Sequence, residues 1–198
     1  MGPAATAPSS RREELLERAY RYVLQHGLAE MSLRPLAEAV GSSPRVLLFL
    51  FGSKDGLVRA LLARGRREEV ALLDALRVEV GTGTESHAAL AEGAARVWQW
   101  LSAPEHRDLL RLWVEGYARS LLASDGPWAE FAEHTVHDWL AVLAELQPPH
   151  QRHSAAGAAG AARRTLILAV LRGALLDLLA TGDRTRTTAA VREQLDAL

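Results

Sequence analysis

Apolar residues recur every three or four positions along most of this chain, and no stretch of useful length alternates with period two. Such spacing predicts amphipathic helices and no sheet. The expected helices cover residues 10–26, 32–40, 43–51, 53–80, 90–101, 105–123, 128–147, 165–180 and 187–198. We therefore predict an all-α fold with about nine to ten helices.

Glycines and capping residues mark the helix ends. Gly27, Gly41 and Gly52 each follow a last apolar position, where glycine readily adopts the left-handed conformation that ends a helix. Ser43 followed by Pro44 is typical of a helix start, because serine caps the first amides and proline suits the first turn. The second and third helices are thus separated by a very short turn.

Two stretches lack a clear helical pattern. Residues 1–9 are small, proline-containing and aperiodic, so we expect a disordered tail before a capping box of Ser10 and Glu13. Residues 150–162 contain the run A-A-G-A-A-G-A-A, whose two glycines favour a loop. The expected helices therefore leave both stretches out.

Three short helices followed by a long one predict a helix-turn-helix whose third helix enters the major groove of DNA. The charge distribution agrees with this prediction. Residues 1–66 hold ten basic and six acidic side chains, a net charge of +4, whereas the remaining residues hold 13 basic and 18 acidic ones, a net of −5. A basic N-terminal third on an acidic body therefore indicates a head that binds an anion such as DNA.

Cationic and hydroxyl side chains lie at the predicted helix starts of the head. Arg45 falls in the first turn of the third helix, from which side chains reach base edges. Arg34 and Lys54 lie at the starts of the second and fourth helices, while Ser42 and Ser43 offer hydroxyls and a helix N-terminus to a phosphate. These residues form the candidate DNA-binding surface.

Residues 12–62 resemble the tetracycline-repressor (TetR) family of transcription regulators. The matching runs are M-S-L-R-P-L-A over residues 31–37, G-S-S over 41–43 with Leu47, and F-G-S-K-D-G-L over 51–57, which is similar to the family signature F-x-S-K-[DE]-x-L. The DNA contacts expected on this basis come from Ser32, Arg34, Ser42, Ser43, Pro44, Arg45, Phe49 and Lys54.

The third helix departs from the family pattern. Leu48 and Leu50 stand where the family usually has an aromatic residue and a His or Tyr, and leucine donates no hydrogen bond to phosphate. We expect recognition to depend more on Arg45 and on contact between Phe49 and a thymine methyl group. Two outcomes stay open: an operator read through fewer polar contacts, or a lower affinity.

The resemblance implies a DNA-binding head over residues 10–55 and a ligand-binding and dimerisation body over residues 56–198. A small effector bound in the body would release two heads from a palindromic operator, as in a repressor. All five tryptophans fall between residues 98 and 139, and the helix over 105–123 is apolar almost all round, which predicts a central helix and an apolar or aromatic effector. The candidate ligand-binding residues are Trp98, Arg111, Trp113, Glu115 and Tyr117. A salt bridge between Arg111 and Glu115, four residues apart, is the alternative interpretation of that pair.

The resemblance also implies a homodimer through helices near residues 127–146 and 163–181. In the second of these, the apolar residues exceed what one intramolecular face needs; they are Leu168, Val170, Leu171, Leu175, Leu176 and Leu179. The rival hypothesis is a helical effector-binding or scaffolding dimer with weakened DNA recognition.

Several other functions are disfavoured by the sequence. There is no cysteine, which excludes disulfides and cysteine nucleophiles. His134 and His137 lack an evident third metal ligand, and no serine stands in a nucleophile-elbow pattern, so we expect no metal, no cofactor and no enzymatic activity. No apolar run has the length of a membrane span and the N-terminus lacks a secretory signal, which predicts a cytoplasmic protein with no membrane partner.

Overall fold

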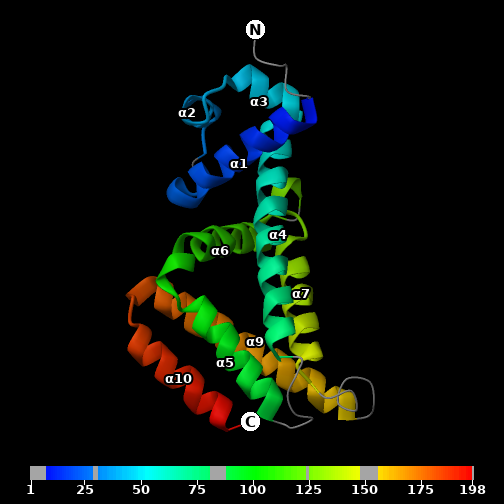
Figure 1. Cartoon of the computed structure of the whole chain (residues 1–198), viewed down its shortest axis with the longest axis vertical. Coiled ribbons are helices and arrows are strands. Elements are labelled where there is room, and N and C mark those ends of the chain that lie inside the picture. The colour runs from blue at the N-terminus through cyan, green and yellow to red at the C-terminus, as the bar shows by residue number, and fades with distance from the viewer. Residues whose placement is uncertain (1–7, 29–30, 81–87, 124, 148–155, 198) are drawn as a thin grey trace. The chain divides into compact units, whose positions relative to one another are not determined.

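The protein is described here by a computed structural model, which covers residues 8–28, 31–80, 88–123, 125–147 and 156–197. Over these residues the chain forms nine α-helices, two short 3₁₀ helices and no strand (Figure 1). The α-helices are α1 (Pro8–His26), α2 (Leu33–Ala39), α3 (Pro44–Phe51), α4 (Lys54–Val80), α5 (Ala88–Leu101), α6 (Arg107–Leu122), α7 (Phe131–Glu145), α9 (Ala156–Thr181) and α10 (Arg184–Asp196). The predicted all-α fold is confirmed.

The chain divides into two compact units. Unit 1 consists of Met1–Glu68 and Arg111–Ala132, and unit 2 consists of Glu69–Leu110 and Glu133–Leu198. Unit 1 therefore combines the first helices of the chain with most of α6. The domains expected at residues 10–55 and 56–198 stay a prediction, because compact units need not coincide with functional domains.

The core of unit 1 joins the first four helices. Its buried apolar side chains include Leu15, Ala19 and Val23 of α1, Leu36 and Val40 of α2, Leu47 and Phe51 of α3, and Leu57 and Leu61 of α4. Gly27 follows the end of α1, Gly41 lies just after α2, and Gly52 follows α3; their φ values are 78°, 67° and 78°. The glycine stops predicted for these three helices are therefore present.

The core of unit 2 includes residues of α5, α7, α9 and α10. Its buried apolar side chains include Leu90, Val97 and Trp98 of α5, Trp139 and Leu143 of α7, Ile167, Leu168, Leu171 and Leu175 of α9, and Val191 and Leu195 of α10. Helices α5, α9 and α10 pack against one another, in green, orange and red in Figure 1. None of the described helices is long and apolar enough to cross a membrane.

Two stretches predicted to be irregular are helical. Helix α1 begins at Pro8, so Pro8 and Ser9 are not part of a tail, while residues 1–7 lie outside the described residues. Helix α9 begins at Ala156 and includes residues 156–162, which were expected in a loop. Alanine favours helix enough to offset glycines that each cost about 1 kcal/mol. Tertiary contact adds to this, because Gly160 is buried and its carbonyl accepts a hydrogen bond of 3.3 Å from Gln147 Nε2.

The composition of α6 predicts a helix that is apolar almost all round, but the structure shows otherwise. Leu110 and Leu112 are buried, whereas Leu121 and Leu122 near its C-terminal end are exposed, Leu122 by 88%. Arg111 is exposed as well. The C-terminal turn of this helix therefore does not have the central position that we expected from its apolar residues.

Candidate nucleic-acid interface and ligand-binding residues

The turn between α2 and α3 fixes the start of the candidate recognition helix. Ser42 N donates to Ala37 O at 2.8 Å, and Gly41 supplies the left-handed residue that the turn requires. Ser43 is the N-cap of α3, and its hydroxyl accepts a hydrogen bond from Val46 N at 3.3 Å. Pro44 occupies the first turn, as the sequence predicted.

Two arginines of α1 hold the C-terminal ends of α2 and α3. Arg12 Nε donates to Leu50 O at 3.3 Å, and its guanidinium lies 4.9 Å from the centre of the Phe51 ring. Arg18 Nη1 donates to Val40 O at 3.3 Å. Each guanidinium satisfies a carbonyl at a helix end, where cations are favourable. Sequence reasoning missed these roles, because the partners lie 38 and 22 residues away and give no local signal.

All eight predicted DNA-contacting residues are accessible to solvent. Ser32, Arg34, Ser43, Arg45, Phe49 and Lys54 are exposed, whereas Ser42 and Pro44 are half-buried. Phe49 is 84% exposed, although a phenylalanine side chain strongly favours burial. Their contact with DNA stays a prediction.

Apolar side chains make up most of the accessible surface of α3. Val46 and Leu48 are exposed beside Phe49, and Leu50 is half-buried. Arg45 is the one charged residue of this helix. The exposed face of α3 therefore combines one cation with an apolar surface.

The starts of α2 and α4 differ in their capping. Ser53 accepts a hydrogen bond from Gly56 N at 2.9 Å, so its hydroxyl caps the first turn of α4 next to Lys54. Ser32 is the N-cap of α2 but makes no side-chain cap hydrogen bond. The Ser32 hydroxyl is therefore available to another acceptor or donor, such as a phosphate oxygen.

An ion-pair cluster links α1 to α4 within unit 1. Arg64 bonds to Glu17 at 2.5 Å and to Glu68 at 3.0 Å, and its guanidinium lies 4.7 Å from the centre of the Tyr20 ring. The hydrogen bond that Arg64 Nε donates to the Glu17 carboxylate raises the pKa of Arg64. Burial and the nearby Glu68 carboxylate raise the pKa of Tyr20, so its hydroxyl stays protonated. The cluster thus joins α1 and α4 through charged side chains within unit 1.

The candidate ligand residues of α6 fall on different faces of the helix. Trp113 and Tyr117 are four residues apart, and their ring centroids lie 5.3 Å from each other. Glu115, two residues from each, points elsewhere: its Oε2 accepts a hydrogen bond of 2.9 Å from Leu28 N, at the end of α1. No ion pair joins exposed Arg111 to Glu115 among the described contacts, so the alternative salt bridge is absent there. The structure therefore does not bring these four residues to one site.

Two buried polar atoms of α6 have no hydrogen-bond partner among the residues that the structure describes. They are the indole nitrogen of Trp113 and the Oε1 atom of Glu115. A buried polar group without a partner costs about 1–3 kcal/mol. Trp113 therefore has an unused donor beside the ring of Tyr117, where a ligand acceptor would be stabilising.

Trp98, the fifth predicted ligand residue, lies on α5 in unit 2. Its indole N–H donates to Thr188 Oγ1 of α10 at 3.0 Å. It lines a groove between α5 and α10 with a volume of about 440 Å³.

Unit 2 also buries the carboxylate of Glu69. This carboxylate accepts a hydrogen bond from Trp139 Nε1. Sequence reasoning missed it because α4 carries several other charged residues.

Comparison with known proteins agrees with this architecture. Residues 15–61 match the family model described as "Bacterial regulatory proteins, tetR family". A transcriptional regulator from Rhodococcus sp. Rha1 shares 19% identity at a TM-score of 0.70, with 97% of this chain and 95% of that chain covered. No curated protein matches the chain.

Two further similar structures contain small molecules. The multidrug binding protein EbrR, complexed with imidazole, shares 23% identity at a TM-score of 0.65, covering 98% of this chain and 97% of that one. A protein described as a transcriptional regulator from Saccharomonospora viridis, in complex with choline, shares 20% identity at a TM-score of 0.68, covering 96% and 95%. At these identities the likeness establishes the fold.

Proposed function

We propose that the chain belongs to the TetR family of bacterial regulatory proteins, because the model of that family matches residues 15–61. We propose that it is a repressor that binds a palindromic DNA operator as a homodimer and is released by a small effector. Such a protein acts on DNA in the cytoplasm. The helix-turn-helix of unit 1 is the part that would read the operator.

The observation that carries the proposal is that α3 is fixed at both ends and exposes the side chains between them. Its N-terminus is capped by Ser43, and Arg12 holds its C-terminal carbonyl at Leu50. Between these fixed ends Arg45 and Phe49 are exposed. A helix held at both ends, with one cation and one aromatic ring open to solvent, is suited to insertion into a major groove.

Selection of duplexes from a random DNA library, followed by gel shift, tests this proposal. We expect a palindromic sequence to be enriched, and Arg45→Ala to weaken its binding by about 1–3 kcal/mol and relax the preference at one base pair per half-site. Arg192→Ala, a matched change on α10 in unit 2, should leave affinity unchanged. Failure to enrich any duplex would favour the rival hypothesis of an effector-binding or scaffolding dimer.

For the effector, we propose an aromatic or apolar molecule that contacts Trp113 and Tyr117. Support comes from the paired rings and from the unused indole donor of Trp113. Similar structures hold imidazole or choline, which supports small-molecule binding by this fold. Arg111 and Glu115 are weaker candidates than expected, because one is exposed and the other is engaged by Leu28.

For the dimer, we propose that the exposed face of α9 contacts a second copy of the chain. Its exposed residues at alternating intervals of four and three are Ala162, Leu166, Ala169, Gly173, Leu176 and Ala180. This spacing forms a straight seam along a helix, and its small residues allow two helices to approach closely. Leu166 and Leu176 are 45% and 46% exposed, which is unusual for large apolar side chains.

This seam differs from the set of residues expected from the sequence. Leu168, Leu171 and Leu175 are buried within unit 2 and cannot contact a partner. The sequence alone could not separate these three residues from the dimer surface, because apolar residues occur all round this helix and cannot be assigned to one face. None of the most exposed large apolar residues lies on α7, so its part in the dimer, over residues 127–146, is proposed on the resemblance only.

A further inference from the structure

A groove runs between α5 and α10 in unit 2. It has a volume of about 440 Å³, which is within the range of small-molecule sites. Ala95 and Trp98 contribute from α5, while Val191 and Leu195 contribute from α10. The groove is thus lined on both sides by apolar groups, and all of its described walls belong to one compact unit.

The aromatic floor of the groove is fixed in position. Trp98 is only 2% exposed, and its indole N–H is satisfied by Thr188 Oγ1 across the two helices. Val191 and Leu195 are buried beside it. Because the one polar atom of the indole already has a partner, the floor offers a ligand apolar contact rather than hydrogen bonds.

Two guanidiniums stand at the rim of the same groove. Arg184 and Arg192 both line it, both are exposed, and no acidic residue is among its described lining residues. They lie eight residues apart, which separates them by about 12 Å along the axis of α10 and by about 80° around it, and both face the groove. Neither makes an ion pair among the described contacts. The rim therefore has a net positive charge.

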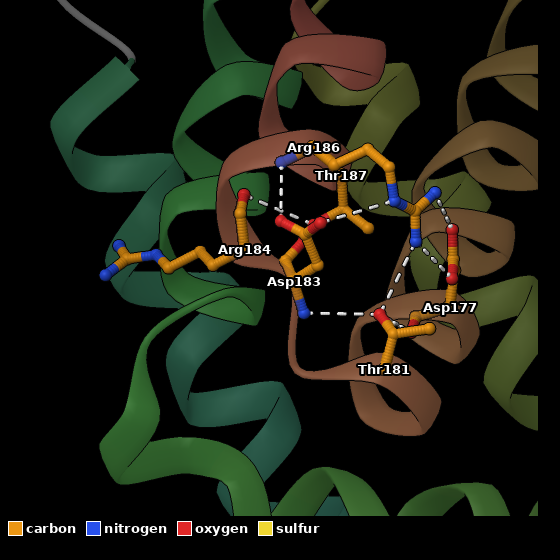
Figure 2. A network of polar contacts seen from close by, with 6 residues as sticks. All are labelled: Asp177, Thr181, Asp183, Arg184, Arg186 and Thr187. Atoms are coloured by element: carbon orange, nitrogen blue, oxygen red, sulfur yellow. Dashed lines mark hydrogen bonds and ion pairs between the residues drawn. The ribbon is translucent and has the colours of Figure 1, made fainter.

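Their neighbour Arg186 is different, because its charge is neutralised. Its guanidinium donates two hydrogen bonds of 2.7 Å to Asp177 of α9 and lies 3.5 Å from Asp183. Figure 2 shows Arg184 pointing away from this pair. The Asp183 carboxylate also caps α10 by accepting from Arg186 N at 3.0 Å. This network fixes the start of α10, so the wall that carries Arg184 is formed before any ligand binds.

We propose that the groove between α5 and α10 binds a small amphipathic organic anion. Its apolar body would lie against Trp98, Val191 and Leu195, and its anionic group would pair with Arg184 or Arg192. Charge complementarity excludes a cation as the preferred ligand, and the apolar floor disfavours a bare inorganic anion. This site is separate from the α6 residues assigned to the effector above and does not depend on DNA binding.

Two fluorescent probes that differ in one charged group test this inference. 1-Anilinonaphthalene-8-sulfonate carries a sulfonate, whereas N-phenyl-1-naphthylamine has the same rings without it. We expect the purified full chain to bind the sulfonate at least about fivefold more tightly. The double variant Arg184→Gln/Arg192→Gln should remove that preference and leave binding of the neutral probe unchanged, while Arg59→Gln on α4 should change neither.

A substitution in the wall locates the probe. Ala95→Phe fills the groove, so a folded variant, checked by circular dichroism, should lose binding of both probes. Equal affinities for the two probes in the wild type, or an unchanged preference in the double arginine variant, would overturn the inference. A chain that shows the expected probe pattern but enriches no duplex would contradict the proposed function and leave this site standing.

Discussion

Three arginines of unit 1 lie in two different environments, which the sequence alone does not distinguish. Arg45 is exposed at the start of α3, whereas Arg12 and Arg18 donate to the carbonyls that end α3 and α2. We propose that the first contacts a base or phosphate, whereas the other two position α3 and α2. Their mutation should therefore have different consequences.

We expect Arg12→Ala to weaken binding to all duplexes without changing base preference. The variant loses the hydrogen bond to Leu50 O and the contact with the Phe51 ring, so unfolding should become easier by about 1 kcal/mol. Thermal denaturation and binding to matched and mismatched operators measure the two effects. A changed base preference with unchanged stability would mean that Arg12 itself reads DNA.

Phe49 should read thymine methyl groups. Replacing a contacted thymine by deoxyuridine removes one methyl and no hydrogen-bonding atom, and burial of such a group contributes about 0.8 kcal/mol, roughly fourfold in affinity. We expect this loss for the wild type and none for Phe49→Ala. Gel shifts with uracil placed at each position of the selected operator give the four affinities of this cycle. Equal losses in both proteins would exclude the contact.

The exposed residues of the candidate site could be predicted from the sequence, but the residues that position its helices could not. Arg45 and Lys54 could be identified because helix starts and the motif fix their positions locally. Arg12, Arg18 and Glu115 act through backbone groups of other helices, and such contacts depend on packing rather than on spacing. Sequence could group Trp98 with Trp113 only by composition, whereas the structure places them in different units.

At the scale of the element, α9 contributes to two surfaces. Its buried side contributes Ile167 and Leu171 to the core of unit 2, and its other side exposes the seam that includes Gly173 and Leu176. A Cβ atom added at Gly173 would meet no other atom within 4 Å. The chain thus leaves open space at this point of the seam, where we propose that a second helix packs.

Leu176→Arg should convert the proposed dimer into a monomer. Placing a charge in the centre of a helix seam leaves it without a partner, which costs several kcal/mol when buried. The matched control is Leu122→Arg, because Leu122 is even more exposed but lies on α6. Sedimentation at micromolar concentration measures the oligomeric state of both variants. A wild-type monomer, or a dimer in both variants, would contradict the assignment of the seam.

The corner between α9 and α10 should respond to acid. The hydrogen bonds from Arg186 lower the pKa of Asp177 below its ordinary value of 3.8. The pair of Asp177 and Arg186 therefore stabilises the folded chain fully above pH 3.8, and this contribution is lost as the pH falls through the lowered pKa of Asp177. NMR titration of the Asp177 carboxyl carbon should give a midpoint below 3.8 that returns to the ordinary value in Arg186→Gln. A normal midpoint in the wild type would contradict the pairing.

Helix ends could be predicted where one residue type decides them. Gly27, Gly41 and Gly52 adopt the left-handed conformation that ends a helix, so the pattern was sufficient. The start of α9 was missed because local propensity was nearly balanced between alanine and glycine, and the contact of Gln147 with Gly160 is tertiary. Periodicity also could not show which side of α9 is buried, since apolar residues occur all round it.

For the whole molecule, α6 is the element that could connect effector and DNA. One face carries Trp113 and Tyr117, and another holds Leu28 at the end of α1 through Glu115. A ligand that shifts α6 would therefore move this contact. The connection lies within unit 1 and uses a single hydrogen bond to the backbone.

We expect Glu115→Ala to uncouple effector from operator. Effector affinity and operator affinity, each measured alone, should change little, while the factor by which effector weakens operator binding should fall toward one, from a typical range of 5–150-fold. Arg111→Ala, on the same helix but exposed, is the matched control. Full coupling in the Glu115→Ala protein would show that the signal takes another route.

Lys54 carries the chain's one side-chain amine, because every other basic residue apart from histidine is arginine. It is exposed at the first residue of α4, beside the N-terminus of a helix on the candidate DNA surface. An acylating reagent that is selective for amines therefore modifies a single side chain. Mass spectrometry of that one adduct, with and without duplex, becomes a footprint of the interface, and the protein's arginine-rich composition supplies the selectivity.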